Sequence, residues 1–292
     1  MNLEGSLVAI ITPFKDGKVD EECLRKLVNW HIEQGTNGLV PCGTTGESAT
    51  LSHDEHEQVV EIVVDEAKGK IPVVAGTGSN NTEEAVRLSQ HAEKAGADAC
   101  LVIAPYYNKP TQRGIYEHFK KVADSVKIPI VMYNIQSRTG INMQPETIAK
   151  LANDCKNIIA IKEASGSLDQ ACQIRLLCGD KLTILSGDDA LLLPLMSVGA
   201  KGVISVVANI VPNDVANIVK AFNASNITEA MKWHYKLYPL IKAMFIETNP
   251  IPVKAAMKML GLCSDDLRLP MYEMEEVNKK KLEKALKEYG IL

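Results

Sequence analysis

The chain has 292 residues, of which 46% are hydrophobic and 23% are charged, and its formal net charge is −4. This length and composition predict an ordinary globular protein with a sizeable core, built as one large domain or as one barrel with an appendage. The slightly negative charge gives no electrostatic reason to expect nucleic acid or an anionic membrane as a partner.

The cysteines and the first residues of the chain indicate a cellular compartment. Seven cysteines are scattered without a C-x-x-C pair, which is typical of reduced thiols in a reducing environment. The opening stretch MNLEGSLVAIITPF contains an acidic residue, and its apolar run is too short for a signal peptide. No segment of the sequence reaches the apolar length of a membrane span. We therefore expect a cytoplasmic protein.

Short apolar runs rich in β-branched residues recur at a steady interval over about the first 220 residues, with amphipathic stretches of helical period between them. The first amphipathic stretch, DEECLRKLVNWHIEQG, predicts a helix. Its apolar face consists of Cys23, Leu24, Leu27, Val28 and Ile32. The next helix is expected to begin at Ser52, which is spaced from Glu55 as in a capping box. The eight apolar runs begin near Leu7, Gly38, Ile71, Ala99, Ile128, Ile158, Leu182 and Gly202.

Eight strands that alternate with helices must run parallel, and this number of units predicts a closed (β/α)₈ TIM barrel over residues 1–224. An open, doubly wound sheet is the competing arrangement. The remaining residues, 225–292, lack strand signals and predict a C-terminal helical appendage. Its helices are expected in ITEAMKWHYKLYPLIKAMF, PIPVKAAMKMLG and EVNKKKLEKALKEYG.

The stretch NIIAIKEASG places Lys162 at the end of a fully apolar run. Strict alternation predicts two faces, one with Ile158, Ala160 and Lys162 and the other with Ile159, Ile161 and Glu163. If the face of Lys162 is the inner one, burial should lower the pKa of its amine. A neutral, desolvated amine can form a Schiff base with a carbonyl substrate. The alternative is that Lys162 reaches the surface or pairs with an acid.

Active sites of such barrels lie at the C-terminal ends of the strands, where this chain places several hydroxyl groups. Thr44 and Thr45 follow one run in CGTTGES, Tyr106 and Tyr107 follow another in PYYNKP, and Tyr133 ends a third. Hydroxyl groups around an amine can pass the protons that imine formation requires. Taken singly, each tyrosine could instead be a packing residue, and the threonine loop a simple turn.

Two other patterns do not predict a cofactor or a metal. GTGSNN follows a strand signal, but Asn81 stands where a dinucleotide fingerprint needs glycine. His53 and His56 lie three apart at a helix start, but they are not part of an H-E-x-x-H pattern. We expect no metal site.

Six motifs in order along the chain together resemble the dihydrodipicolinate synthase family of pyruvate-dependent class I aldolases. They are GTTGESATLSHDEH (43–56), PYYNKPTQ (105–112), YN..SRTG (133–140), IKEASG (161–166), LSGDD (185–189) and GVISV (202–206). The similarity continues to NPIPVKAAMKMLGL and LRLP near the C-terminus. The resemblance implies a (β/α)₈ barrel with a C-terminal helical segment. It also implies condensation of pyruvate with L-aspartate-4-semialdehyde, without a metal or an organic cofactor.

The resemblance further implies roles for individual residues. Lys162 forms the imine with pyruvate, and Tyr133 passes protons in a relay with Thr44 and Tyr107. Tyr107 is contributed across a subunit interface. Arg138 holds the carboxylate of the aldehyde substrate. The pyruvate pocket is lined by Thr45, Gly187 and Ile204.

Feedback inhibition by lysine and a homotetramer made of two tight dimers are also implied by the resemblance. The lysine site would consist of Ser48, Ala49, His53, His56, Asn80, Glu84 and Tyr106. The alternative is that the histidines and Glu84 simply occupy exposed helix starts, where polar and acidic residues are common.

One departure from the family pattern lies beside Arg138. The family usually carries Val-Pro where this chain has Ile135 and Gln136. Proline fixes one backbone torsion and removes an N–H, so without it the segment that carries Arg138 is expected to be less rigid.

Two alternative functions remain open. The first is another aldolase of the superfamily, such as N-acetylneuraminate lyase or a keto-deoxy sugar acid aldolase. Arg138 argues against it because its side chain suits a second carboxylate. The second is a non-catalytic, ligand-sensing barrel, against which the combination of Lys162, Tyr133, Thr44 and Tyr107 argues.

Overall fold

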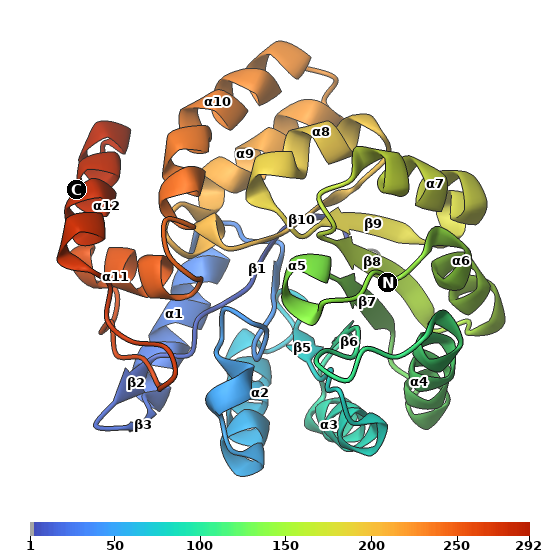
Figure 1. Cartoon of the computed structure of the whole chain (residues 1–292). Coiled ribbons are helices and arrows are strands. Elements are labelled where there is room, and N and C mark those ends of the chain that lie inside the picture. The colour runs from blue at the N-terminus through green and yellow to red at the C-terminus, as the bar shows by residue number, and fades with distance from the viewer. Residues whose placement is uncertain (1–2) are drawn as a thin grey trace.

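The eight predicted apolar runs form eight parallel strands at the centre of the molecule (Figure 1). The computed structural model describes residues 3–292. The strands are β1 (Gly5–Val8), β4 (Gly38–Leu39), β5 (Val74–Gly76), β6 (Ala99–Ile103), β7 (Ile130–Asn134), β8 (Ile158–Glu163), β9 (Thr183–Ser186) and β10 (Gly202–Ser205). Their order in the sheet is β4-β1-β10-β9-β8-β7-β6-β5. A parallel bridge between Leu39 and Val73 joins the two ends. The barrel prediction is confirmed, and the open sheet is wrong.

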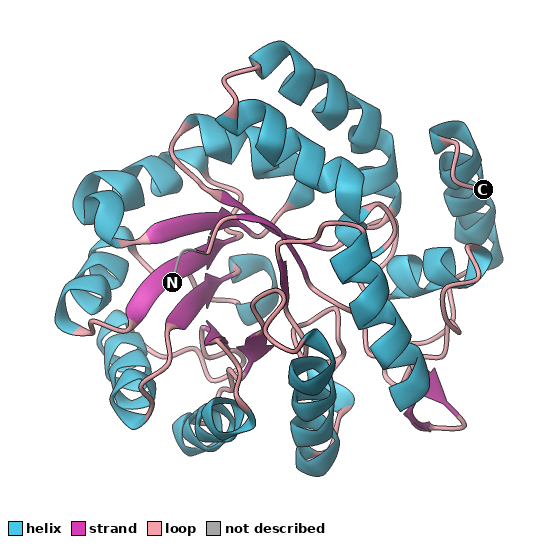
Figure 2. Cartoon of the chain, turned by 180° about the vertical axis from the view of Figure 1, so that it is seen from behind, coloured by secondary structure: helices cyan, strands magenta, loops and turns pink. Residues whose placement is uncertain are grey.

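Helices surround these strands on the outside, as both views show (Figures 1 and 2). They are α1 (Glu21–Glu33), α2 (His53–Ala67), α3 (Thr82–Ala95), α4 (Gln112–Ser125), α6 (Pro145–Asp154), α7 (Leu168–Cys178), α8 (Leu192–Ser197) and α9 (Pro212–Asn223). The short helix α5 (Gln136–Thr139) lies instead at the centre of the molecule, over the strands (Figure 1). The capping box at Ser52 and Glu55 is present at the start of α2. It supplies partners to backbone N–H groups that a helix start leaves free.

The apolar face predicted for α1 is confirmed at its centre. Leu24, Leu27 and Val28 are buried, whereas Cys23 and Ile32 lie at the edge of the core. His31 is also buried on this face, and burial lowers the pKa of its imidazole to about 3, so the ring is neutral.

The register of β8 departs from strict alternation at its first residues. Ile130 pairs with Ile158, but Val131 pairs with Ala160, so one extra residue stands in β8. The prediction for the first two residues is therefore wrong: Ile158 belongs to the core under the helices, and Ile159 packs against the barrel interior. From Ala160 onward the alternation holds and directs Lys162 inward.

Three helices follow the barrel, as predicted: α10 (Ile227–Ala243), α11 (Ile251–Met259) and α12 (Glu276–Tyr289). α10 packs on α9 and α12, and α11 packs on α12, at one side of the barrel (Figure 1). The division at residue 224 stays a prediction. A short hairpin, β2 (Phe14–Lys15) and β3 (Lys18–Val19), was not predicted. Among residues 3–292, every helix is too short or too polar to cross a bilayer.

Candidate active site

A cavity of about 310 Å³ opens where the strands β4 to β7 end. Thr44 reaches it from the loop after β4, Tyr106 from the segment after β6, and Tyr133 from β7 itself. The C-terminal segment supplies another wall through Asn249 and Met271. The cavity thus has the position in the barrel that the active-site prediction required.

Lys162 lies directly beside this cavity, next to Tyr133 on the neighbouring strand. The two residues are register partners, and Nζ of Lys162 is 4.4 Å from the centroid of the Tyr133 ring. Lys162 is 6% exposed, and among residues 3–292 it forms no ion pair. Burial lowers the pKa of the amine to about 8; the charge of Asp189 raises it and that of Arg138 lowers it further. About a tenth of the amine is therefore neutral, and nucleophilic, at pH 7, far more than for an ordinary lysine.

Tyr133 brings a phenol ring next to this amine in the barrel interior. Burial raises the pKa of Tyr133 to about 12, although the charge of Arg138 and a hydrogen bond with Thr44 lower it in part. The phenol consequently keeps its proton at neutral pH. A protonated phenol beside a neutral amine can both donate and accept protons during carbonyl addition.

Gly187, directly after β9, approaches Lys162 closely, and Ile204 lies on β10. The N–H of Gly187 donates to the carbonyl of Glu163 over 2.8 Å. A Cβ at Gly187 would lie 3.1 Å from both Cγ and Cε of Lys162 and 2.6 Å from Cβ of Ala164, so the loop needs glycine to approach the lysine. Ile204 is fully buried in the barrel interior.

Thr45 is buried next to the cavity rather than on its wall. Its hydroxyl accepts a hydrogen bond of 3.0 Å from Nδ2 of Asn249. The two threonines of the loop therefore differ, since Thr44 faces the cavity and Thr45 contacts the C-terminal segment.

Arg138 stands on α5, a single helical turn at the mouth of the cavity. Its Nη2 donates to the carbonyl of Asn249 over 3.2 Å. The N–H of Gly140 donates to the carbonyl of Gln136, and the hydroxyl of Thr139 to that of Ile135. Gln136 is the first residue of the turn, where proline is common but not required. The turn is closed by these bonds without a proline, and the expected loss of rigidity stays a prediction.

The side chains of Tyr106 and Tyr107 differ in exposure, although the two residues do not continue strand β6. β6 ends at Ile103, and Tyr107 takes a left-handed conformation with φ of 71°. Tyr106 lines the cavity, whereas Tyr107 is 87% exposed and points away from it. Within one chain, the relay of Tyr133 and Thr44 therefore lacks Tyr107.

The residues predicted to bind lysine lie in the loops after β4, β5 and β6 or in the first turns of α2 and α3. Ser48 and Ala49 line the same cavity as Tyr106. Nε2 of His53 lies 2.5 Å from Oε1 of Glu84. The side chain of Asn108 donates to the carbonyl of Asn80.

His56 is buried, so the alternative that the histidines simply occupy exposed helix starts is wrong for this residue. Its Nε2 donates to the carbonyl of Gly76 over 2.8 Å. Burial lowers the pKa of the ring, partly offset by this hydrogen bond. In the described part of the chain, Nδ1 of His56 has no hydrogen-bond partner. A neutral His56 thus offers a free acceptor.

Two buried polar residues of the site were missed from the sequence. Asn249 is 4% exposed and joins Thr45 to Arg138 through its amide and its carbonyl. Oδ2 of Asp189 accepts the N–H groups of Val206 and Val207 at 3.0 Å each, which ties the loop after β9 to the end of β10. Both lie in motifs quoted above, NPIPVKAAMKMLGL and LSGDD, but neither ends an apolar run, which is the local signal that singled out Lys162 and Tyr133.

A (β/α)₈ barrel that buries a lysine of lowered pKa at a strand end, beside a protonated tyrosine, has the site of a lysine-dependent, Schiff-base enzyme. The sequence model of the dihydrodipicolinate synthetase family matches residues 2–289, and the chain belongs to this family. The chain is 58% identical to 4-hydroxy-tetrahydrodipicolinate synthase of Endomicrobium trichonymphae over 288 residues, 99% of each protein. The crystal structure of dihydrodipicolinate synthase from Aquifex aeolicus is 51% identical, with a TM-score of 0.98 over 99% of each chain.

Two further similar structures were solved with small molecules. The chloride-inhibited dihydrodipicolinate synthase of Acinetobacter baumannii, complexed with pyruvate, is 43% identical and has a TM-score of 0.97 over the whole of both chains. The enzyme of Cyanidioschyzon merolae with lysine bound is 40% identical and has a TM-score of 0.97 over 99% of each chain.

Proposed function

We propose that this chain condenses pyruvate with L-aspartate-4-semialdehyde to give 4-hydroxy-tetrahydrodipicolinate, the first committed step of lysine and diaminopimelate biosynthesis. The observation that carries the proposal is the buried amine of Lys162, with its pKa lowered to about 8, next to Tyr133 at the strand ends. Full-length relatives that bear the name of this activity support it.

The chemistry begins at the neutral amine of Lys162. It attacks the ketone carbon of pyruvate, and loss of water leaves an imine; the protonated imine acidifies the methyl group, and removal of a proton gives an enamine. The enamine carbon attacks the aldehyde carbon, whose oxygen takes a proton to become the hydroxyl group. The amino group of the former semialdehyde then attacks the imine carbon, which closes the ring and expels the amine of Lys162. Tyr133 is placed to carry protons in these steps.

The remaining residues bind and orient the two substrates. Thr44 and the partner-supplied Tyr107 would complete the proton relay with Tyr133. Arg138, at the mouth of the cavity, would bind the carboxylate of the aldehyde substrate, because its planar fork can hold two oxygens. The pyruvate pocket would be formed by Thr45, Gly187 and Ile204.

Lysine, the end product, would inhibit from the loops after β4, β5 and β6. Glu84 and Asn80 would take its α-ammonium group, and Tyr106 would donate to its carboxylate. The side-chain ammonium group would be surrounded by Ser48, the carbonyl of Ala49, His53 and His56. The relative from Cyanidioschyzon merolae with lysine bound supports a lysine site in this family.

The active unit would be a homotetramer of two tight dimers, working in the cytoplasm. The exposure of Tyr107, at 87%, supports a subunit contact, because the relay within one chain lacks this hydroxyl. The seven unpaired cysteines support a reducing compartment.

The proposal is tested by trapping and then by a substrate panel. Borohydride added with pyruvate should attach mass to the peptide that contains Lys162, and the Lys162→Ala variant should show none. Pyruvate is then offered with aspartate semialdehyde, with N-acetylmannosamine and with sugar-derived aldehydes. Turnover with the sugar-derived aldehydes but not with aspartate semialdehyde would reject the proposal, as would an adduct on a different lysine.

A further inference from the structure

The loop after β4, residues 43–50, is held in an unfavourable backbone conformation. Cys42, just before it, and Glu47, within it, both have φ of 54°, in the left-handed region that non-glycine residues rarely adopt. Such conformations persist only where the surrounding structure imposes them. The same loop carries Thr44 and Thr45, so their positions depend on what holds the loop.

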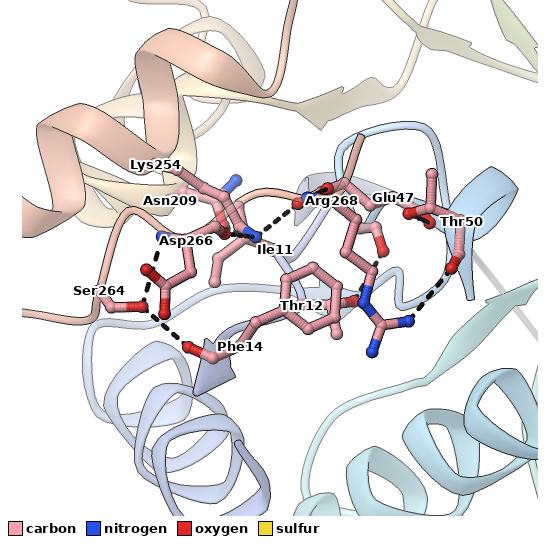
Figure 3. A network of polar contacts seen from close by, with 11 residues as sticks. Ile11, Thr12, Phe14, Glu47, Thr50, Asn209, Lys254, Ser264, Asp266 and Arg268 are labelled. Carbon is pink, nitrogen blue, oxygen red and sulfur yellow. Dashed lines mark hydrogen bonds and ion pairs between the residues drawn. The ribbon is translucent and has the colours of Figure 1, made fainter. Parts of the chain in front are cut away.

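Glu47 is held by a buried ion pair with the C-terminal segment (Figure 3). Its Oε1 accepts from Nζ of Lys254 on α11, and its Oε2 accepts from the N–H of Arg268 over 3.1 Å. The side chain of Lys254 is fully buried; its Nζ also donates to the carbonyl of Asp266 over 2.7 Å and lies 4.2 Å from the centroid of the Phe14 ring. Both charges are therefore satisfied by fixed partners.

Two further contacts tie the C-terminal segment to the same loop. Nη1 of Arg268 donates to the carbonyl of Thr50 over 3.1 Å, and its guanidinium group also binds Glu55 at the start of α2. Nδ2 of Asn249 donates to the hydroxyl of Thr45. Residues that follow the barrel thus form hydrogen bonds with the loop at Thr45, at Glu47 and at Thr50.

A buried ion pair is a costly way to obtain stability, because apolar residues of similar size often stabilise a fold equally well or better. The pair does fix the orientation of the Glu47 side chain, since each hydrogen bond holds one carboxylate oxygen in place. We propose that Glu47 and Lys254 are positioning residues, which hold the loop after β4 so that Thr44 faces Tyr133. The catalytic consequence rests on the function proposed above, but the effect on the loop does not.

The first test measures the loop itself. Glu47→Leu with Lys254→Met replaces the pair by apolar residues of similar size and leaves no buried charge unpaired. We expect this double variant to fold with a melting temperature close to that of the unmodified protein. Hydrogen–deuterium exchange at residues 43–50 should nevertheless become about tenfold faster or more. The control is Lys258→Met, a substitution on the same helix as Lys254. It removes an exposed ion pair with Asp265 and should leave the exchange at residues 43–50 unchanged.

The second test measures the catalytic consequence. In the double variant, kcat for condensation should fall about tenfold or more, because small displacements of catalytic groups are costly. Borohydride trapping of pyruvate on Lys162, which stands on β8, should be retained. The control Lys258→Met should keep both the kcat for condensation and the trapping of pyruvate.

Each outcome decides the proposal separately from the proposed function. Unchanged exchange at residues 43–50 would overturn the positioning role, whatever the kinetics. Faster exchange with unchanged kcat would show that the pair holds the loop but does not position Thr44 for catalysis, and would overturn the proposal in that respect. If the unmodified protein does not turn over aspartate semialdehyde, the proposed function fails, while the exchange experiment still decides what Glu47 and Lys254 do.

Discussion

The surroundings of Lys162 change its chemistry although, among residues 3–292, it forms no ion pair. Its pKa of about 8 in the folded chain lies well below the value of about 10.4 for a free lysine. The difference follows mainly from burial among barrel residues, and the charge of Arg138 adds to it. The reactivity of this residue should therefore follow pH in a range where other lysines stay charged.

The first prediction concerns this pH dependence. With saturating pyruvate and cyanoborohydride, the rate of adduct formation should rise about tenfold from pH 6 to 7 and about fivefold from pH 7 to 8, because only the neutral amine attacks. Above pH 8 the rate should level off. The rate is measured from pH 6 to 10 by intact-mass spectrometry. A rate that keeps rising to pH 10 would show that the pKa of Lys162 is not lowered.

The second prediction concerns Arg138. Arg138→Ala should lower kcat/KM for aspartate semialdehyde by about 10- to 100-fold, the usual range for a lost charged hydrogen bond. Trapping of pyruvate should survive. Because the charge of Arg138 lowers the pKa of Lys162, its removal should also shift the pH profile of trapping toward higher pH. Gln136→Ala, on the same helical turn, is the matched control. Unchanged kinetics toward the aldehyde would place the carboxylate site elsewhere.

At the scale of structural elements, the loops after β4, β5 and β6 would serve both the proposed catalytic site and the proposed lysine site. The cavity that Tyr133 and Thr44 enter is also lined by Ser48, Ala49 and Tyr106, three of the residues proposed to bind lysine. A lysine molecule bound by Ser48, Ala49 and Tyr106 would therefore contact walls of the cavity that Thr44 and Tyr133 also line. Coupling free energies of about 1–3 kcal/mol are typical where two sites share such elements.

The third prediction is inhibition by lysine and its loss in two variants. Lysine at millimolar concentration should inhibit the unmodified enzyme, and Glu84→Thr and His56→Lys should each weaken the inhibition. The pKa of His56 is lowered by burial, so this ring stays a neutral acceptor at pH 7. Inhibition should weaken only as pH falls below the ordinary range of histidine and His56 takes up a proton, because burial lowers the pKa of this ring. Inhibition constants measured at pH 5 and pH 8 check this; variants inhibited as strongly as the unmodified enzyme would reject the site.

At the scale of the whole molecule, Tyr107 is proposed to join the relay from a partner subunit. In one chain its side chain is exposed, whereas Tyr133 and Thr44 face the cavity. An interface with two-fold symmetry would let each subunit supply Tyr107 to the other.

The fourth prediction is recovery of activity in mixed subunits. Tyr107→Phe and Lys162→Ala chains, each strongly impaired alone, are unfolded and refolded together. If Tyr107 acts across the interface, each hybrid dimer contains one complete site, and an equal mixture should recover about a quarter of full activity. The fraction of hybrids is measured by native mass spectrometry. Hybrids without activity would show that Tyr107 serves its own subunit or has no role.

The sequence by itself determined the architecture and the central residue of the site. Continuous apolar runs and amphipathic stretches of period 3.6 are local patterns, and they located all eight barrel strands and the three C-terminal helices. The position of Lys162 at the end of an apolar run was equally local. Such features can be predicted because they depend on neighbours within a dozen or so residues.

Only the tertiary structure decided how the local pieces meet. The extra residue in β8 arises from pairing with β7, and no pattern within β8 reveals it. Tyr107 points outward because of its left-handed backbone, although its sequence neighbours look like a continuing strand. Lys254 reaches Glu47 across 207 positions, and Asn249 reaches Thr45 across 204. Contacts of this kind, like the pKa of a buried group, depend on which distant groups the folded chain brings together, and sequence periodicity carries no information about them.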